Sequence, residues 1–226
     1  DGAEKNFEYN SLVRFMFGDL VEAIAILVMK SAGVDIEAEQ KAVKLQLGKH
    51  SVSGTLDVEI DGKVWDIKSA SPYAFEQKFG QMGGYKKIKE DDVFGYVSQG
   101  YLYSKSRDKD FGGWIVINKA SGEWVVCEAP ELQEEDKKEA LALAEKNLNA
   151  LLSGEKFKRC FTDKEETYKD KDKNVKKTGN RVLSSICGFC DFKRTCWPDA
   201  IMHRKVGSTA RFPKSVWYSK LKKREI

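Results

Sequence analysis

The chain has 226 residues, of which 41% are hydrophobic and 33% are charged, and its formal net charge is +4. This length predicts one domain of good size, or one domain with a small appendage, that can bury a hydrophobic core. The longest apolar run, residues 12–29, is interrupted by Asp19 and Glu22, so the sequence predicts no membrane span. The sequence also shows no secretory signal pattern, which favours a cytoplasmic protein.

Hydrophobic periodicity and turn signals predict a helix, several strands, a second helix, two more strands and a third helix. The expected ranges are helix 9–32, strands 42–48, 53–60 and 63–70, a Gly- and Tyr-rich loop 71–85, helix 90–105, strands 112–118 and 122–128, and helix 130–152. The segment after Gly154 is expected to be irregular. This order of elements predicts an α/β fold around a mixed sheet.

The charge is unevenly distributed along the chain. Residues 154–226 contain 20 Lys and Arg and 9 Asp and Glu, a net of +11, which leaves a net of −7 for residues 1–153. The expected division is therefore a core at 1–153 and a basic C-terminal segment at 154–226 that packs on it. The basic segment suits a phosphate backbone, although solvated surface lysines give the same composition.

The most informative stretch is the expected hairpin around Asp61-Gly62, a strong signal for a tight turn. Because strand side chains alternate, Asp66 and Lys68 are expected on one face of the second strand. With Asp57 from the first strand, two carboxylates and an amine can gather at one edge of the sheet. Such a group can hold a hard divalent cation and orient a water molecule. The alternative is a solvated hairpin whose charged side chains face water.

Two further features flank this hairpin in the sequence. Glu22 is the only charged residue within 20–29, and an unpaired carboxylate in a buried helix costs several kcal/mol. It is tolerated if it binds a metal ion or pairs with a cation such as Arg14. Downstream, Gln99 and Tyr103 are four residues apart, which places them on one face of the second helix.

The motifs Glu22, Gly54-x-x-Asp57, Asp66-x-Lys68 and Gln99-x-x-x-Tyr103 occur in the order that is found in PD-(D/E)XK nucleases. The chain resembles the RecB-like branch of that superfamily, which includes CRISPR-associated and phage exonucleases, over residues 15–104. It departs from the pattern at two points. Leu56 stands in place of the proline that often precedes Asp57, and Glu22 stands where many RecB-like members carry His.

The resemblance implies a restriction-endonuclease-like core, a mixed central sheet flanked by helices, followed here by a cysteine-clamped segment. It also implies a Mg²⁺- or Mn²⁺-dependent deoxyribonuclease, by expectation an exonuclease, that acts on DNA with a single-stranded end. The expected setting is a bacterial or phage-infected cytoplasm, with recombination or replication proteins as further partners and no membrane. Two other hypotheses remain: a non-catalytic nucleic-acid-binding module on the same fold, and a metal-clamped interaction protein.

The resemblance implies a role for each motif residue. The implied ligands of Mg²⁺ or Mn²⁺ are Asp57, Asp66, Glu22 and the carbonyl of Ile67. Lys68 would orient the attacking water or stabilise the charged transition state. Gln99 and Tyr103 would position Lys68 or the substrate backbone.

The cysteines divide into one isolated residue and one cluster. Cys127 lies in an apolar strand pattern and is expected in the core. Cys187, Cys190 and Cys196 form C-x2-C-x5-C, and Cys160 lies 27 residues before the first of them. The Lys- and Glu-rich composition argues against a disulfide framework, whereas four thiolates can hold zinc or an iron–sulfur cluster.

The C-x2-C-x5-C triplet resembles the C-terminal cysteines of RecB-like nucleases that carry a [4Fe–4S] cluster. In those proteins the fourth cysteine usually precedes the nuclease core, whereas here Cys160 follows it, so zinc remains the alternative metal. His203 is the alternative fourth ligand. The expected role of the metal is structural, because residues 155–198 contain few apolar residues and metal affinity would supply folding free energy.

Two basic stretches remain in the C-terminal segment. Lys169–Lys177 alternates in sign and is expected to be a mobile loop. The tail 211–224 combines basic residues with the aromatic residues Trp217 and Tyr218. This composition suits single-stranded nucleic acid, whose phosphates pair with cations and whose bases stack on aromatic rings. Alternatively, these two aromatics attach the tail to the core.

Overall fold

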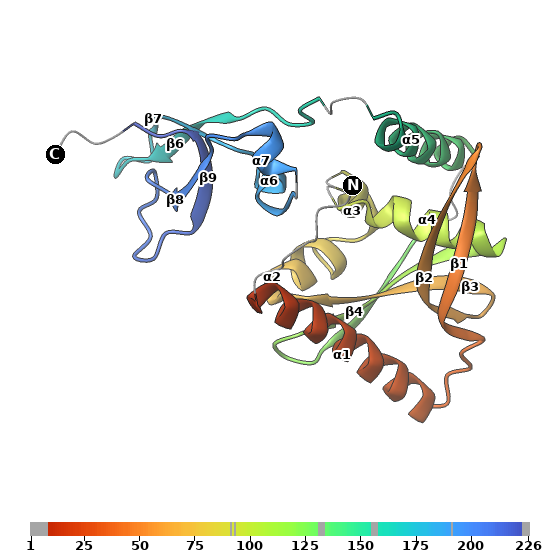
Figure 1. Ribbon diagram of the computed structural model, residues 1–226. Helices are drawn as coiled ribbons and strands as arrows, with labels where there is room; N and C mark the ends of the chain where they lie inside the picture. Colours follow the sequence, from red (N-terminus) through yellow and green to blue (C-terminus); the bar gives the residue numbers. More distant parts are fainter. Residues whose placement is uncertain are drawn as a thin grey trace. The chain divides into compact units, whose positions relative to one another are not determined.

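The computed structural model describes residues 9–90, 92, 94–130, 134–154, 158–190 and 192–222. The chain divides into two compact units, residues 1–153 and 154–226, as shown in Figure 1. This boundary coincides with the change in net charge along the sequence. Within the described residues, the structure contains no helix with both the length and the apolar character that crossing a bilayer requires.

Unit 1 is a mixed sheet with helices on its faces. Its elements are α1 (Tyr9–Ser31), β1 (Ala38–Leu47), β2 (His50–Ile60), β3 (Lys63–Ala70), α2 (Pro72–Ala74), the π-helix η1 (Phe75–Phe79), α3 (Tyr85–Glu90), α4 (Tyr96–Arg107), β4 (Asp110–Asn118), β5 (Trp124–Glu128) and α5 (Glu134–Leu152). The sheet order is β1-β2-β3-β4-β5, and only the β3–β4 pair is parallel. The predicted α/β class with a mixed sheet is confirmed.

The β2–β3 hairpin turns at the predicted dipeptide. Asp61 and Gly62 have φ angles of 50° and 71°, and Ile60 pairs with Lys63 across the turn. Two successive positive φ angles are typical of a type I′ turn, whose twist matches that of the strands it joins. The sequence signal was therefore sufficient to set the register of this hairpin.

Each face of the sheet has its own core, and α1 and α4 lie on opposite sides of β3 and β4 in Figure 1. The α1 side is built from aliphatic residues: Val21, Ala25, Ile26, Met29, Val58, Ile67, Ile115 and Ile117. The other side is rich in aromatic residues: Ala70, Phe75, Phe79, Ile88, Phe111, Trp114, Val116 and Cys127. The strands thus send successive side chains to two buried layers, as the period of two requires.

Two predictions about unit 1 are wrong in detail. The expected loop 71–85 contains α2 and η1, because Phe75 and Phe79 are buried in the aromatic core and pull this segment into helical turns. The helix expected at 90–105 instead begins at Tyr96, where the Asp92 carboxylate accepts hydrogen bonds from the N–H groups of Tyr96 and Val97. The first residues of the helix expected at 130–152 include 131–133, which lie outside the described residues.

Unit 2 is also ordered, contrary to the prediction of an irregular segment. Its elements are β6 (Lys164–Lys169), β7 (Val175–Val182), α6 (Ser185–Phe189), α7 (Lys193–Cys196), β8 (Ile201–Arg204) and β9 (Ser215–Lys220), with the antiparallel sheet order β6-β7-β9-β8. The expected mobile loop 169–177 is the turn of the β6–β7 hairpin. Its Asp170 carboxylate accepts from the N–H groups of Asp172 and Asn174 and pairs with Lys176 at 3.1 Å.

A buried carboxylate explains why this small sheet holds together. Glu166 accepts hydrogen bonds from the hydroxyl of Tyr218 at 2.6 Å, the amide of Asn180 at 2.9 Å, the hydroxyl of Thr178 at 2.8 Å and the N–H of Gly207 at 3.0 Å. Four donors from distant parts of the sequence satisfy one carboxylate, which is what a buried charge requires. The fully buried Tyr218 therefore attaches the C-terminal strand to the core of unit 2.

Candidate functional site

The strands β2 and β3 separate at the predicted acidic group. Their pairing runs from Ile60/Lys63 only as far as Val58/Trp65. In the fork beyond that point, Asp57 Oδ2 accepts the N–H of Ile67 at 2.6 Å, in place of a backbone partner. The fork thus opens a gap between two strands and fixes a carboxylate inside it.

Asp66 and Lys68 share the face of β3 opposite to Ile67, which belongs to the α1-side core. Asp66 is 2% exposed, and its Oδ1 accepts a hydrogen bond from Lys68 Nζ at 2.8 Å. Its other oxygen, Oδ2, is buried and has no hydrogen-bond partner among the described residues. Because a buried polar oxygen without a partner is costly, this oxygen is a candidate for contact with a water molecule or a bound ion.

Glu22 reaches the same group from α1. The side-chain amide of Gln40 donates a hydrogen bond to Glu22. Burial raises the pKa of Glu22 to about 7, with further contributions from the charges of Asp57 and Asp66. Arg14, the sequence-based alternative partner of Glu22, has a side chain that lies outside the described residues.

The remaining ionisable groups of the site also influence one another. Burial raises the pKa of Asp66 to about 7, Asp57 adds to the rise, and Lys68 opposes it. Burial raises the pKa of Asp57 as well, although the Ile67 N–H and Lys68 moderate the effect. Burial alone would lower the pKa of Lys68, but the two aspartates outweigh it and the pKa is raised. Three carboxyl groups therefore face one ammonium, an excess of negative charge that favours a divalent cation.

The predicted pair on α4 lies beside a groove. Gln99 Nε2 donates to the hydroxyl of Tyr103 at 3.4 Å, and both residues line an apolar groove of about 360 Å³ between α4 and the β1–β2 hairpin. A Cβ atom on Gly54 would lie 2.8 Å from the Tyr103 ring, so the glycine of the Gly54-x-x-Asp57 motif makes room for that ring. The described residue of α4 that contacts Lys68 is instead Tyr96, whose ring centre lies 5.5 Å from Nζ.

Sequence reasoning missed Tyr96 and Gln40. Tyr96 precedes Gln99 by three residues, and this helical spacing is a signal that could have joined it to the motif. Gln40 has no such signal, because its contact with Glu22 links a strand to a helix. Its backbone φ of 45° is uncommon for a residue other than glycine.

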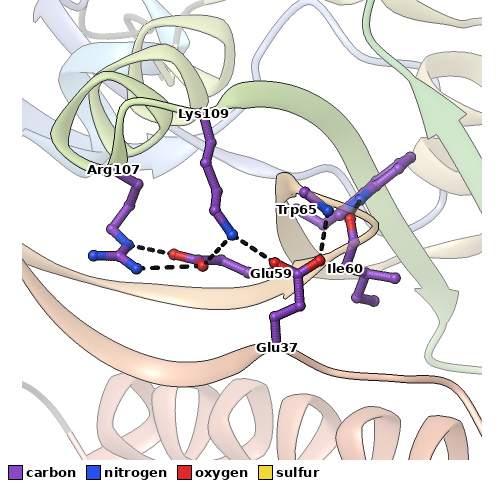
Figure 2. Close-up of polar contacts among 7 residues, drawn as sticks. Glu37, Glu59, Ile60, Trp65, Arg107 and Lys109 are labelled. Atoms are coloured by element: carbon purple, nitrogen blue, oxygen red, sulfur yellow. Dashed lines mark hydrogen bonds and ion pairs between the residues drawn. The ribbon is translucent and has the colours of Figure 1, made fainter.

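A second buried carboxylate on β2 has the opposite environment, as Figure 2 shows. Glu59 is 1% exposed and pairs with Arg107 and with Lys109, the latter at 2.7 Å, while Glu37 accepts from Lys109 at 2.6 Å. Arg107, together with Lys109, lowers the pKa of Glu59 to about 2. Glu59 is thus a satisfied structural carboxylate, whereas Asp66 on the adjacent strand is buried with one oxygen unpaired. This contrast makes Asp66, rather than Glu59, the candidate for a functional carboxylate.

Substitution of the structural carboxylate is expected to affect stability alone. Glu59→Gln should lower the free energy of unfolding by about 2 kcal/mol, because Arg107 and Lys109 lose their shared partner. Urea denaturation of the variant at pH 7 measures this loss. Activity at the site around Asp66 should stay within about twofold of the parent, and a stable variant with impaired turnover would contradict the assignment.

The site carboxyls also predict a pH dependence of stability in the absence of divalent metal. Glu22 and Asp66 have folded-state pKa values raised to about 7 from 4.5 and 3.8, so the native state retains protons that the unfolded state has released. The free energy of unfolding should therefore fall as the pH rises from about 4.5 to about 7. Urea titrations of the parent and of Glu22→Gln/Asp66→Asn should show that the double variant loses less stability across this window; equal slopes would contradict the prediction.

The four cysteines of the predicted cluster all belong to unit 2. Burial raises the pKa of Cys187, with smaller contributions from the thiols of Cys190, Cys196 and Cys160. Arg159, the neighbour of Cys160, donates a hydrogen bond to the Cys196 carbonyl at 2.8 Å. The fold therefore brings the segment that contains Cys160 beside the segment that contains Cys196, although the two are far apart in the sequence. A set of four thiols suits zinc or an iron–sulfur cluster.

The other two predicted residues of this group have separate surroundings. His203 lies on β8, where its Nδ1 is 2.8 Å from the Arg204 carbonyl and its ring meets the edge of Tyr218. Cys127 is buried in the aromatic core of unit 1, as predicted, and burial raises its pKa to about 11.

In the described part of the chain, no three His, Cys, Asp or Glu side chains are close enough together to hold a metal ion as they stand. Comparison with models of known protein families finds no match to this chain, and comparison with curated protein sequences finds no significant match.

Proposed function

We propose that this chain is a metal-dependent DNA nuclease with a restriction-endonuclease-like core. The observation that carries the proposal is the unpaired Oδ2 of the buried Asp66, in a group with Asp57, Glu22 and Lys68. A mixed sheet with a helix on each face and a fork between β2 and β3 supports the same assignment. The alternative of a solvated hairpin does not account for a carboxylate that is 2% exposed.

Asp57, Asp66 and Glu22 would hold the cation, as their oxygen donors suit Mg²⁺ or Mn²⁺. When bound, such a cation polarises the scissile phosphate and lowers the pKa of a coordinated water molecule. The chain itself supplies the remaining functions. Lys68 carries a proton at Nζ beside Asp66, where its positive charge can orient a water molecule and stabilise the developing negative charge.

Neighbouring residues would hold these groups in place. The N–H of Ile67 fixes Asp57 from within the fork, and the amide of Gln40 fixes Glu22. The ring of Tyr96 lies beside the ammonium of Lys68 and excludes water from one side of it. Gln99 and Tyr103 line the groove next to Gly54, where they would contact the substrate strand rather than Lys68.

Unit 2 supports DNA as the substrate. Residues 154–226 carry a net charge of +11, and the cationic groups of Lys193 and Arg194 lie 3.9 and 4.8 Å from the ring centre of Trp217. Cations beside aromatic rings suit phosphates and stacked bases. The four cysteines would hold a [4Fe–4S] cluster, with Zn²⁺ as the alternative, in a structural role.

The direct experiment compares labelled linear DNA with covalently closed circular DNA in Mg²⁺, in Mn²⁺ and in EDTA. Metal-dependent loss of linear DNA alone supports an exonuclease, and cleavage of circles indicates an endonuclease. If the chain binds DNA without added metal and cleaves it in neither Mg²⁺ nor Mn²⁺, the result would favour the non-catalytic nucleic-acid-binding module instead.

Glu22→Gln separates a metal-binding role from a structural one. If Glu22 is a ligand, activity should fall by two orders of magnitude or more, while stability holds or rises because repulsion within the carboxylate group is relieved. Thermal melting and cleavage rates of the same preparation measure both effects. Glu128→Gln, which makes the same change at an exposed carboxylate of β5, is the matched control. Lower stability with normal turnover would make Glu22 a structural residue.

A further inference from the structure

The side of α1 that faces away from the sheet carries a second apolar stripe. It consists of Val13, Phe17, Leu20, Ile24 and Leu27, whose spacings alternate between four and three residues. All five side chains are 40–64% exposed. The stripe that packs on the sheet lies on the opposite side of the helix, so α1 is apolar on two faces.

The spacing identifies the kind of surface that this stripe fits. Apolar residues that recur every 3.5 positions form the seam of a helix pair, in which the side chains of one helix enter the gaps of the other. No charged residue occupies a seam position. A helix that is apolar on all sides is usually buried on all sides. The second stripe of α1, in contrast, is exposed to solvent in the described part of the chain.

The area of the stripe is sufficient for a stable interface. Together with the exposed neighbours Met16 and Val28, it offers on the order of 700 Å² of apolar surface, close to the ~800 Å² that each partner contributes to a standard interface. The largest apolar patch on an ordinary monomer is roughly 300–600 Å². The stripe therefore exceeds what a free surface usually carries.

We propose that α1 pairs with α1 of a second copy of this chain, in antiparallel orientation and with Leu20 on the two-fold axis. The stripe extends seven residues to either side of Leu20, so Val13 faces Leu27 of the other copy, and Phe17 lies within one residue of the position opposite Ile24. Such a pairing is self-complementary, as a two-fold interface requires. Antiparallel helices also place opposite ends of their dipoles together.

A second copy fits the stripe better than the other described helices of the chain do. The seam spans 15 residues, about 21 Å at the rise of an α-helix. The helices of unit 2 have only five and four residues, and α5 contacts α4 and β1 of its own unit. The 23-residue α1 of another copy has both the length and the spacing of the seam.

The first test is the molar mass of the full chain by light scattering and sedimentation. We expect a dimer for the parent, and dissociation constants at least ~100-fold higher for Leu20→Glu, which brings two like charges together on the axis, and for Ile24→Glu, which buries a charge against the apolar Phe17. Circular dichroism should stay unchanged, since both positions are exposed in the protomer. The matched control is Leu143→Glu, an exposed leucine of α5, which should leave the dimer intact.

Three outcomes would overturn the proposal. They are a monomeric parent at about 100 µM, a Leu20→Glu variant that remains dimeric, and a Leu143→Glu variant that dissociates, which would indicate contact between α1 and α5.

Cysteine cross-linking tests the orientation. Leu20→Cys should form a disulfide-linked dimer under mild oxidation, whereas the parent with its own five cysteines should not. Val13→Cys and Leu27→Cys should cross-link to each other when mixed, and neither should cross-link alone. Cross-linking of either variant alone would indicate a parallel pair and overturn the antiparallel arrangement. None of these results depends on nuclease activity.

Discussion

Asp66→Asn is expected to reduce DNA cleavage by on the order of 10³-fold or more, because the amide cannot supply the negative oxygen that a divalent cation requires. The variant should remain folded and bind DNA. At pH 8 its free energy of unfolding should equal or exceed that of the parent, since the pKa of Asp66 is raised to about 7 by burial and the ionised carboxylate destabilises the native state. Single-turnover cleavage and urea denaturation measure the two effects.

Lys68→Ala should give a comparable loss of cleavage for a different reason. It removes the ammonium that lies 2.8 Å from Asp66 Oδ1 and leaves the metal ligands in place. Full activity of either variant, in both Mg²⁺ and Mn²⁺, would contradict the site. Glu59→Gln is the matched control for Asp66→Asn, because it also converts a buried carboxylate to an amide.

Cys187→Ser, Cys190→Ser and Cys196→Ser are each expected to lose bound metal and several kcal/mol of the stability of unit 2. The buried apolar cluster of this unit is small, with Leu183, Cys187 and Ala200 among the described residues, so under the proposal metal binding would add substantially to its folding free energy. Thermal melting and metal content check both points. Cys127→Ser is the control: it should retain metal and lose about 1–2 kcal/mol, because a hydroxyl replaces a buried thiol.

Cys160→Ser decides which residue is the fourth ligand. Loss of metal in this variant supports Cys160, whose neighbour Arg159 is bonded to the Cys196 carbonyl. Retention of stoichiometric metal would remove Cys160 from the set and indicate His203 or a ligand from outside the chain. Elemental analysis of the parent should find iron with sulfide, and the fresh protein should be brown; zinc without sulfide would support the alternative metal.

The sequence was most informative where the signals are local. The turn Asp61-Gly62 carries its own backbone preference, and the alternation of β3 places Asp66 and Lys68 on one face of the strand. Glu22 stood out as a lone charge in an apolar helix. These residues are brought together because the hairpin and α1 adopt the conformations that their own sequences favour.

The parts that escaped prediction depend on contacts between distant segments. The sheet of unit 2 is held by Glu166, whose donors include Asn180, Gly207 and Tyr218, and no short pattern marks such a network. Likewise, Gln40 joins the site through its hydrogen bond from β1 to Glu22 of α1, which no local pattern predicts. The unpaired Oδ2 of Asp66 could not be deduced at all, because the sequence predicts a carboxylate at that position but not its burial.

The most direct measurement is a titration with Mn²⁺ at pH 8, followed by calorimetry and by the spin-resonance signal of free Mn²⁺. The central claim is that the buried carboxylate of Asp66 binds a divalent cation together with Asp57 and Glu22. The parent and Glu59→Gln should bind one or two Mn²⁺ ions with equal affinity, and Asp66→Asn should lose this binding. Binding by Asp66→Asn that is as tight as in the parent would contradict the account.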